Sequence, residues 1–169
     1  MRKVSVIAGV CALVCLLGLF GRSEQTAKAS RGAAPQFSLP DAKGAPVKLT
    51  DYKGKVVLLN FWATWCHGCV EEIPWFIDFQ QKYKDQGLVV VGLSQDDGWG
   101  AVNDYVAAKK VNYPVLLDTK HVSDDYDLGG MPMSVLIDRS GRIAAKHVGV
   151  VDRSATEAEI KSLLQESAK

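Results

Sequence analysis

The most constraining feature of the sequence is a Cys-x-x-Cys motif placed between a strand and a helix. Residues 56–61 are almost continuously apolar, and two tryptophans lead from them to Cys66 and Cys69, where a helical pattern begins. This order predicts a buried strand whose end delivers both cysteines to a helix N-terminus. The unpaired amide groups and the dipole at a helix N-terminus stabilise an anion. The first sulfur should therefore ionise more readily than an ordinary cysteine.

Two thiols at this spacing favour disulfide exchange, because a thiolate attacks a disulfide and a second thiol can resolve the mixed disulfide. Zinc binding is an alternative, but the sequence has no second Cys-x-x-Cys and no His-x-x-x-His pair. A haem attachment site would need histidine directly after the second cysteine, where the chain has Val70. A purely structural disulfide over so short a loop would constrain the unfolded chain very little.

The N-terminal residues 1–29 are typical of a targeting segment. Arg2 and Lys3 precede an uncharged run over residues 4–20. As a helix with a rise of ~1.5 Å per residue, this run would be about 25 Å long. The hydrocarbon core of a membrane is ~30 Å thick, so the run is slightly short for a span but within the tolerated range. A cleaved signal peptide and an uncleaved membrane anchor both fit. Because positive residues stay inside, we expect the rest of the chain in the periplasm or on the outer face of the cytoplasmic membrane.

If the chain is exported, its four cysteines fall into two groups with different expected roles. Cys11 and Cys15 lie in the uncharged run, where we interpret them as apolar filler. Cys66 and Cys69 are then the only cysteines of the exported part, in a compartment where disulfides persist.

Length and charge fit one compact domain with a short extension. The chain has 169 residues, of which 47% are hydrophobic. Its net charge is +1 and its basic residues are scattered, so nucleic acid is not an expected partner. We expect a linker over residues 30–35 and the folded domain over residues 36–169.

The first half of this domain shows a strand-and-helix alternation. Alternating apolar residues predict a short hairpin within residues 37–49. After the central strand, we expect a helix over about residues 66–87, with Pro74 as a kink. A second buried strand over residues 88–93 and a helix over 99–110 should follow.

The second half predicts an extended piece over residues 113–117 and a hairpin of 133–137 with 143–148. Thr156 and Glu159 form a capping-box pattern that should open a final helix. The whole alternation predicts an α/β fold with a mixed central sheet flanked by helices.

With these motifs, the chain resembles the thioredoxin superfamily, and within it the membrane-tethered TlpA/ResA-like thiol–disulfide oxidoreductases. The stretches that carry the resemblance are residues 37–41, 55–66, 72–74, 130–132 and 135–141. The resemblance implies a thioredoxin-like fold with an N-terminal hairpin and a central insert. It also implies a monomer without a cofactor or metal that reduces disulfides in exported proteins such as apocytochromes c, with a membrane thiol donor as a further partner.

The resemblance assigns roles to residues around the motif. Cys66 matches the exposed attacking cysteine, and Cys69 matches the more buried resolving one. Pro132 matches a cis-proline that places the backbone at Met131 beside the disulfide, where an extended substrate can pair with it. We expect Trp65, Met131 and Pro132 to bind substrate.

Three further roles are expected on the same basis. Asn60 stands where cytosolic thioredoxins carry a buried aspartate, and asparagine cannot exchange a proton. Glu72 matches an acidic residue of the TlpA/ResA-like proteins and could handle protons instead; the alternative is an ordinary surface glutamate, as we expect for Glu71. Met131 and Met133 form either an adaptable apolar docking lip or part of the core.

His67 leaves the direction of the chemistry open. A cationic imidazole next to Cys66 would stabilise the thiolate and make the disulfide more oxidising, an effect that fades as pH rises. The alternative is a solvent-facing histidine with little effect. A disulfide oxidant or isomerase is therefore a second candidate function, and a copper or zinc metallochaperone using Cys66, His67 and Cys69 is a third. A peroxidase is the fourth, although a peroxidase's proline–threonine approach is missing before Cys66.

Overall fold

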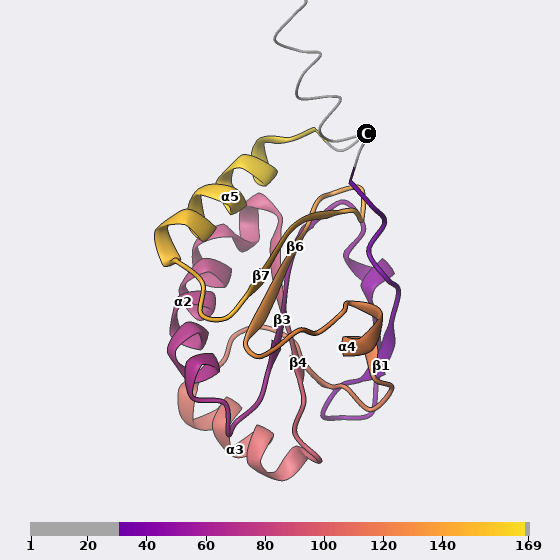
Figure 1. Cartoon of the computed structure of the whole chain (residues 1–169), viewed down its shortest axis with the longest axis vertical. Coiled ribbons are helices and arrows are strands. Elements are labelled where there is room, and N and C mark those ends of the chain that lie inside the picture. Colours follow the sequence, from indigo (N-terminus) through magenta and orange to yellow (C-terminus); the bar gives the residue numbers. More distant parts are fainter. Residues whose placement is uncertain (1–30, 168–169) are drawn as a thin grey trace, which may run out of the picture. The chain divides into compact units, whose positions relative to one another are not determined.

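A five-stranded mixed sheet forms the middle of the computed structural model, which describes residues 31–167 (Figure 1). In spatial order, its strands are β5 (Val115–Leu117), β4 (Leu88–Ser94), β3 (Val56–Trp62), β6 (Met133–Ile137) and β7 (Ile143–Val148). The central strand β3 pairs in parallel with β4 and antiparallel with β6. This is the mixed sheet that the sequence pattern predicts.

Both faces of the sheet are covered (Figure 1). The layer on one face is helical and consists of α2 (His67–Tyr83), α3 (Trp99–Lys109) and α5 (Arg153–Gln165). The layer on the other face consists of the predicted N-terminal hairpin, β1 (Ser38–Pro40) with β2 (Pro46–Lys48), and the short helix α4 (Val122–Asp125). The predicted thioredoxin-like architecture is confirmed.

The central strand is buried along its whole length because it separates two apolar cores. Val57, Leu59 and Phe61 point into the core beneath the hairpin, whereas Val56 and Leu58 point into the core beneath α2 and α5. Full burial of such a side chain is worth about 1.5–3 kcal/mol. The strand is therefore a rigid support for the motif that follows it.

Helix α2 begins immediately after Cys66, which is its N-cap, and contains Pro74. A short 3-10 turn, Lys84–Gln86, extends it. Gly87 then ends the element with a φ of 102°, a left-handed conformation that glycine adopts without strain. The predicted bounds of this helix are confirmed.

The predicted start of the last helix is wrong. The cap of α5 is Asp152, whose side chain accepts a hydrogen bond from the Ala155 amide at 2.8 Å. Thr156 lies inside the helix and is buried, and Glu159 contacts His147 at 2.8 Å. Aspartate is at least as good a cap as threonine, so the earlier residue starts the helix.

The compact unit begins at Ala33, which forms an isolated antiparallel bridge with Arg142. Within residues 31–167, no helix has the length and apolar character needed to cross a membrane. The predicted targeting segment, with Cys11 and Cys15, lies outside the described residues.

Candidate active site

The two cysteines of the motif form a disulfide at the N-terminus of α2. Their Cα atoms are 5.3 Å apart. The Cys66 sulfur accepts a hydrogen bond from the Cys69 amide at 3.3 Å, so it occupies the anion-stabilising position of the helix. Cys66 is 8% exposed and Cys69 is 1% exposed. Cys66 is therefore the more exposed of the two cysteines, and Cys69 is the more deeply buried one.

A tight turn carries the chain from β3 into α2. The Cys66 amide donates a hydrogen bond to the Ala63 carbonyl at 3.2 Å, which closes the turn over Thr64 and Trp65. The Trp65 side chain is 66% exposed, whereas Trp62 is buried against Tyr105 with ring centroids 5.2 Å apart. Of the two tryptophans, Trp65 is the exposed one, and its role in binding substrate stays a prediction.

The loop before β6 lies against the motif. The peptide bond between Met131 and Pro132 is cis, as expected. Met131 is half-buried and packs on the apolar cluster that contains both cysteines. Met133 is fully buried in the core beneath the hairpin. The two methionines therefore differ. Met133 is part of the core, whereas Met131 lies where it could contribute to a docking lip.

Gly68 is a site residue that the sequence reasoning missed. A Cβ atom at this position would lie 2.8 Å from Val150 Cγ2 and 3.3 Å from Pro132 Cδ. Only glycine lets the first turn of α2 approach the cis-proline and the β7–α5 loop this closely. The one available signal was a glycine inside the first turn of a helix, where it is otherwise unfavourable.

Exposed apolar side chains gather around the cysteines. In the part of the chain that the structure describes, the large exposed hydrophobic residues are Trp65, Val148 and Val150. Trp65 adjoins Cys66 in sequence, Val150 faces Gly68, and Val148 Cγ1 would lie 3.6 Å from a Cβ on Gly130. We call Trp65, Val148 and Val150 the apolar rim. Its two valines were not predicted, because nothing in the sequence places them near the motif.

Glu72 is fully buried, one helical turn after Cys69, so the alternative of an ordinary surface glutamate is wrong. Its Oε1 atom accepts a hydrogen bond from the Val151 amide at 2.6 Å. Its Oε2 atom has no hydrogen-bond partner among residues 31–167. Burial raises the pKa of Glu72 from 4.5 to about 7, although the Val151 amide opposes the rise. The neighbouring Glu71 is exposed, as expected.

Asn60 and His67 differ in their relation to the site. Asn60 is buried in β3, where its side-chain amide donates to the Ser134 hydroxyl at 3.2 Å. Asn60 therefore occupies the position of the buried aspartate of cytosolic thioredoxins without supplying an acid.

The His67 side chain is 97% exposed, and its ring lies 3.6 Å from the Glu71 carboxylate. His67 thus faces solvent, and its effect on the thiolate stays a prediction.

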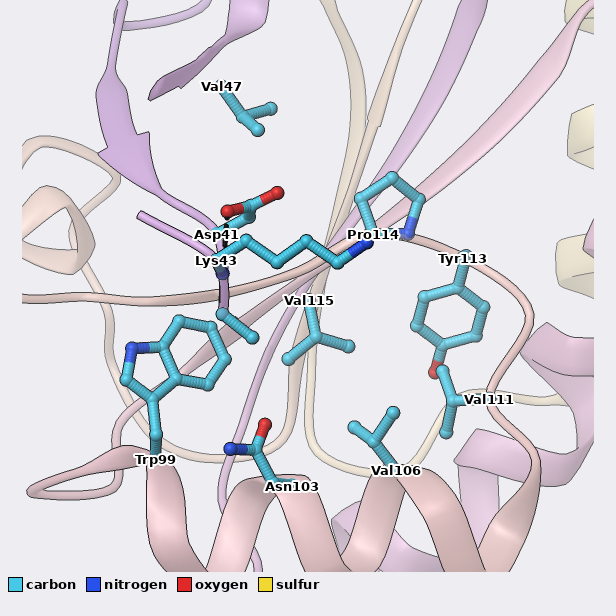
Figure 2. A pocket seen from close by; sticks show the side chains of 11 residues that line it. Asp41, Lys43, Val47, Trp99, Asn103, Val106, Val111, Tyr113, Pro114 and Val115 are labelled. Atoms are coloured by element: carbon cyan, nitrogen blue, oxygen red, sulfur yellow. Dashed lines mark hydrogen bonds between the residues drawn. The ribbon is translucent and has the colours of Figure 1, made fainter. Parts of the chain in front are cut away.

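A separate pocket of about 580 Å³ lies between the N-terminal hairpin and α3 (Figure 2). Trp99, Asn103 and Val106 point into it from α3 (Figure 2). None of the predicted site residues lines it. Among the described side chains, no group of three His, Cys, Asp or Glu residues could hold a metal ion.

The sequence matches one family model and several relatives over most of its length. Residues 31–146 match the model of the AhpC/TSA family. The chain is 35% identical over 161 residues to the thiol-disulfide oxidoreductase ResA of Bacillus subtilis, covering 90% of this chain and 89% of that protein. It is 32% identical over 160 residues to the protein of the same name from Bacillus cereus, covering 94% and 91%.

Solved structures give the same result. A putative thiol:disulfide interchange protein DsbE from Chlorobium tepidum matches with a TM-score of 0.76 and 38% identity, over 79% of this chain and 96% of that one. A putative thioredoxin from Neisseria meningitidis matches with a TM-score of 0.74 and 35% identity, over 80% and 93%. Together with the cysteine pair at the start of α2, these matches place the chain in the AhpC/TSA family of thioredoxin-fold proteins, as a thiol–disulfide oxidoreductase whose redox pair is Cys66 and Cys69.

Proposed function

We propose that this oxidoreductase works as a reductant of disulfides in exported proteins, with apocytochromes c as the substrate class. The observation that carries the proposal is the buried carboxyl group of Glu72, one helical turn from Cys69. Where Glu72 is ionised, it disfavours a second negative charge on the nearby thiols and raises their pKa. A dithiol that is less stabilised as thiolate gives up its electrons more readily, so its disulfide is harder to reduce.

The same carboxyl group suits the proton steps of the reaction. The Cys66 thiolate attacks a substrate disulfide, forms a mixed disulfide and releases one substrate thiolate. Cys69 then attacks the Cys66 sulfur, which releases the second substrate thiolate and leaves the Cys66–Cys69 disulfide. Cys69 must lose its proton for this step. Glu72, with a pKa of about 7, is balanced between accepting and releasing a proton near neutral pH.

The placement of His67 weakens the case for an oxidant. A thiolate-stabilising cation would have to act from a side chain that is almost entirely in solvent, where charge interactions are screened. The ring also lies near the carboxylate of Glu71, which offsets its charge when protonated. Oxidation or isomerisation of disulfides remains the second candidate function, because His67 still adjoins Cys66. The described residues hold no metal-binding cluster in support of a metallochaperone.

The apolar rim supports a protein substrate rather than a small thiol. Exposed hydrophobic side chains in one place are typical of a protein-binding surface. Trp65 precedes Cys66 in the chain, Val150 faces Gly68 between the two cysteines, and Val148 lies near Gly130. The backbone at Met131 is available to pair with an extended chain by strand addition. Export is supported by the N-terminal pattern, in which Arg2 and Lys3 precede an uncharged run.

Substrate trapping tests the proposed substrate class. Reduced Cys69→Ser protein should form a stable mixed disulfide, through Cys66, with an oxidised apocytochrome c, detected as a covalent complex by mass spectrometry. The Cys66→Ser variant should form none, because the remaining sulfur is the more deeply buried of the two. Trapping of other oxidised proteins but not of apocytochrome c would refute the substrate class. Trapping by Cys66→Ser alone would reverse the roles of the two cysteines.

A further inference from the structure

Asp96, just after the end of β4, holds the turn that presents the attacking cysteine. One of its carboxylate oxygens accepts hydrogen bonds from the Thr64 amide at 3.0 Å and from the Ser94 hydroxyl at 2.7 Å. The other accepts from the Thr64 hydroxyl at 2.6 Å. Thr64 is thus gripped at both backbone and side chain, by charge-assisted bonds that are stronger than neutral ones.

The hydrogen bonds of Asp96 begin where the backbone hydrogen bonds between β3 and β4 end. The last register pair of β3 and β4 is Trp62 with Ser94, and the next hydrogen bond runs from the Gln95 amide to the Trp62 carbonyl at 2.8 Å. Beyond that point the segments that follow β3 and β4 are no longer paired through their backbones. The Thr64 amide donates its hydrogen bond to the Asp96 carboxylate instead. The carboxylate therefore replaces the missing ladder for the residues that lead to the cysteine pair.

The held turn determines the positions of two site residues. Its closing bond joins the Cys66 amide to the Ala63 carbonyl, and it leaves the Trp65 side chain exposed. The Cys66 sulfur then meets the Cys69 amide at the helix start. A small rotation of this turn would move the sulfur off the amide groups that stabilise its thiolate.

We propose that Asp96 is a positioning residue for disulfide exchange: its carboxylate locks the turn that aligns the Cys66 sulfur with the N-terminus of α2. The role holds in whichever direction the protein drives exchange, so it goes beyond the proposed reductase function. Asp97, the next residue, is exposed and carries the same charge. It provides a matched control for the electrostatic effect of the carboxylate.

The test uses two effects that shift the pKa of the Cys66 thiol in opposite directions. Removal of a negative charge near a thiol lowers the thiol pKa, whereas loss of alignment with the helix N-terminus raises it. We expect Asp96→Asn to raise the pKa of Cys66, measured in the reduced full-length protein by the pH dependence of its alkylation rate. We also expect the rate of exchange with a protein disulfide to fall about tenfold. Asp97→Asn should leave the rate within twofold and should not raise the pKa.

Thr64→Val provides a second variant that changes no charge and removes one of the three bonds. It should shift the pKa of Cys66 in the same direction as Asp96→Asn and by less, and Thr64→Ser should restore the original value. A fall or no change in the pKa of Cys66 in both Asp96→Asn and Thr64→Val would overturn the proposal. Neither result depends on the redox direction of the protein, so the proposed reductase function would stand or fall separately.

Discussion

Burial changes the chemistry of Glu72 and ties it to the stability of the fold. Its pKa is about 7 in the folded protein and near 4.5 when solvated. Between these values the folded state binds more protons than the unfolded state, so stability falls as pH rises from about 4.5 to 7. The difference corresponds to about 3 kcal/mol of destabilisation above pH 7.

Glu72→Gln should therefore stabilise the protein at pH 8 and have little effect at pH 4. The neutral amide keeps an oxygen for the Val151 amide and avoids burying a charge. Urea unfolding at the two pH values measures the effect, and Glu71→Gln is the control on the exposed side of the helix. Equal stabilisation at both pH values would contradict the raised pKa.

The same substitution should lower the thiol pKa values of the reduced protein. Removing a carboxylate near two ionising sulfurs removes a repulsion, and the coupled titration of carboxyl and thiols should become simpler. Thiolate absorbance against pH measures this directly. If Glu72→Gln and Glu71→Gln give matching curves, Glu72 has no part in the chemistry of the cysteines.

Substitution of Gly68 tests how closely the first turn of α2 packs against Val150 and Pro132. A methyl group there would press on Val150 and Pro132, and overpacking of this kind costs about 1–3 kcal/mol. We expect Gly68→Ala to destabilise the oxidised protein, and Val150→Ala in the same chain to recover part of the loss. A double-mutant cycle of unfolding free energies measures the coupling. Strict additivity of the two substitutions would show that they do not touch.

At the scale of elements, the loop between β7 and α5 connects three parts of the site. The Gly149 amide donates to the Pro132 carbonyl at 2.8 Å, and the Val151 amide donates to Glu72. Between these two anchors, the Val150 side chain faces Gly68. One short segment thus supports the cis-proline, the buried acid and part of the apolar rim.

Replacing Val148 and Val150 together by serine should separate docking from chemistry. The rate with a protein disulfide should fall about tenfold, because two of the three side chains of the apolar rim become polar while the cysteines are untouched. The rate with a small disulfide such as oxidised glutathione should stay within twofold. Equal losses with both substrates would mean that the rim supports the site rather than binding the partner.

Elements with a strong pattern were predictable, and those with a weak one were not. The continuous apolar run of β3 and the long amphipathic α2 give clear signals, and both appear as expected. The four residues of α4 are too few to show a period, so no helix was predicted there. The start of α5 was misplaced because the capping-box pattern of Thr156 and Glu159 was taken as the cap, whereas Asp152, an equally good cap four residues earlier, starts the helix.

At the scale of the whole molecule, the cysteine pair was predictable because its neighbours in sequence are also its neighbours in space. Other parts of the site join residues that are far apart in the chain. Val150 reaches Gly68, Val151 reaches Glu72, and Asp96 reaches Thr64 only after the sheet has formed. The resemblance indicated Glu72 and Pro132, but single-sequence patterns carry no signal for contacts of this range.

The reduction potential of the Cys66–Cys69 pair tests the central claim most directly. The full-length protein would be equilibrated at pH 7 with glutathione and dithiothreitol buffers, and the dithiol fraction would be counted by alkylation and mass spectrometry. As a reductant, the protein should have a potential at or below about −250 mV, close to thioredoxin. A potential between about −120 and −180 mV, the range of disulfide oxidants and isomerases, would contradict the proposed function.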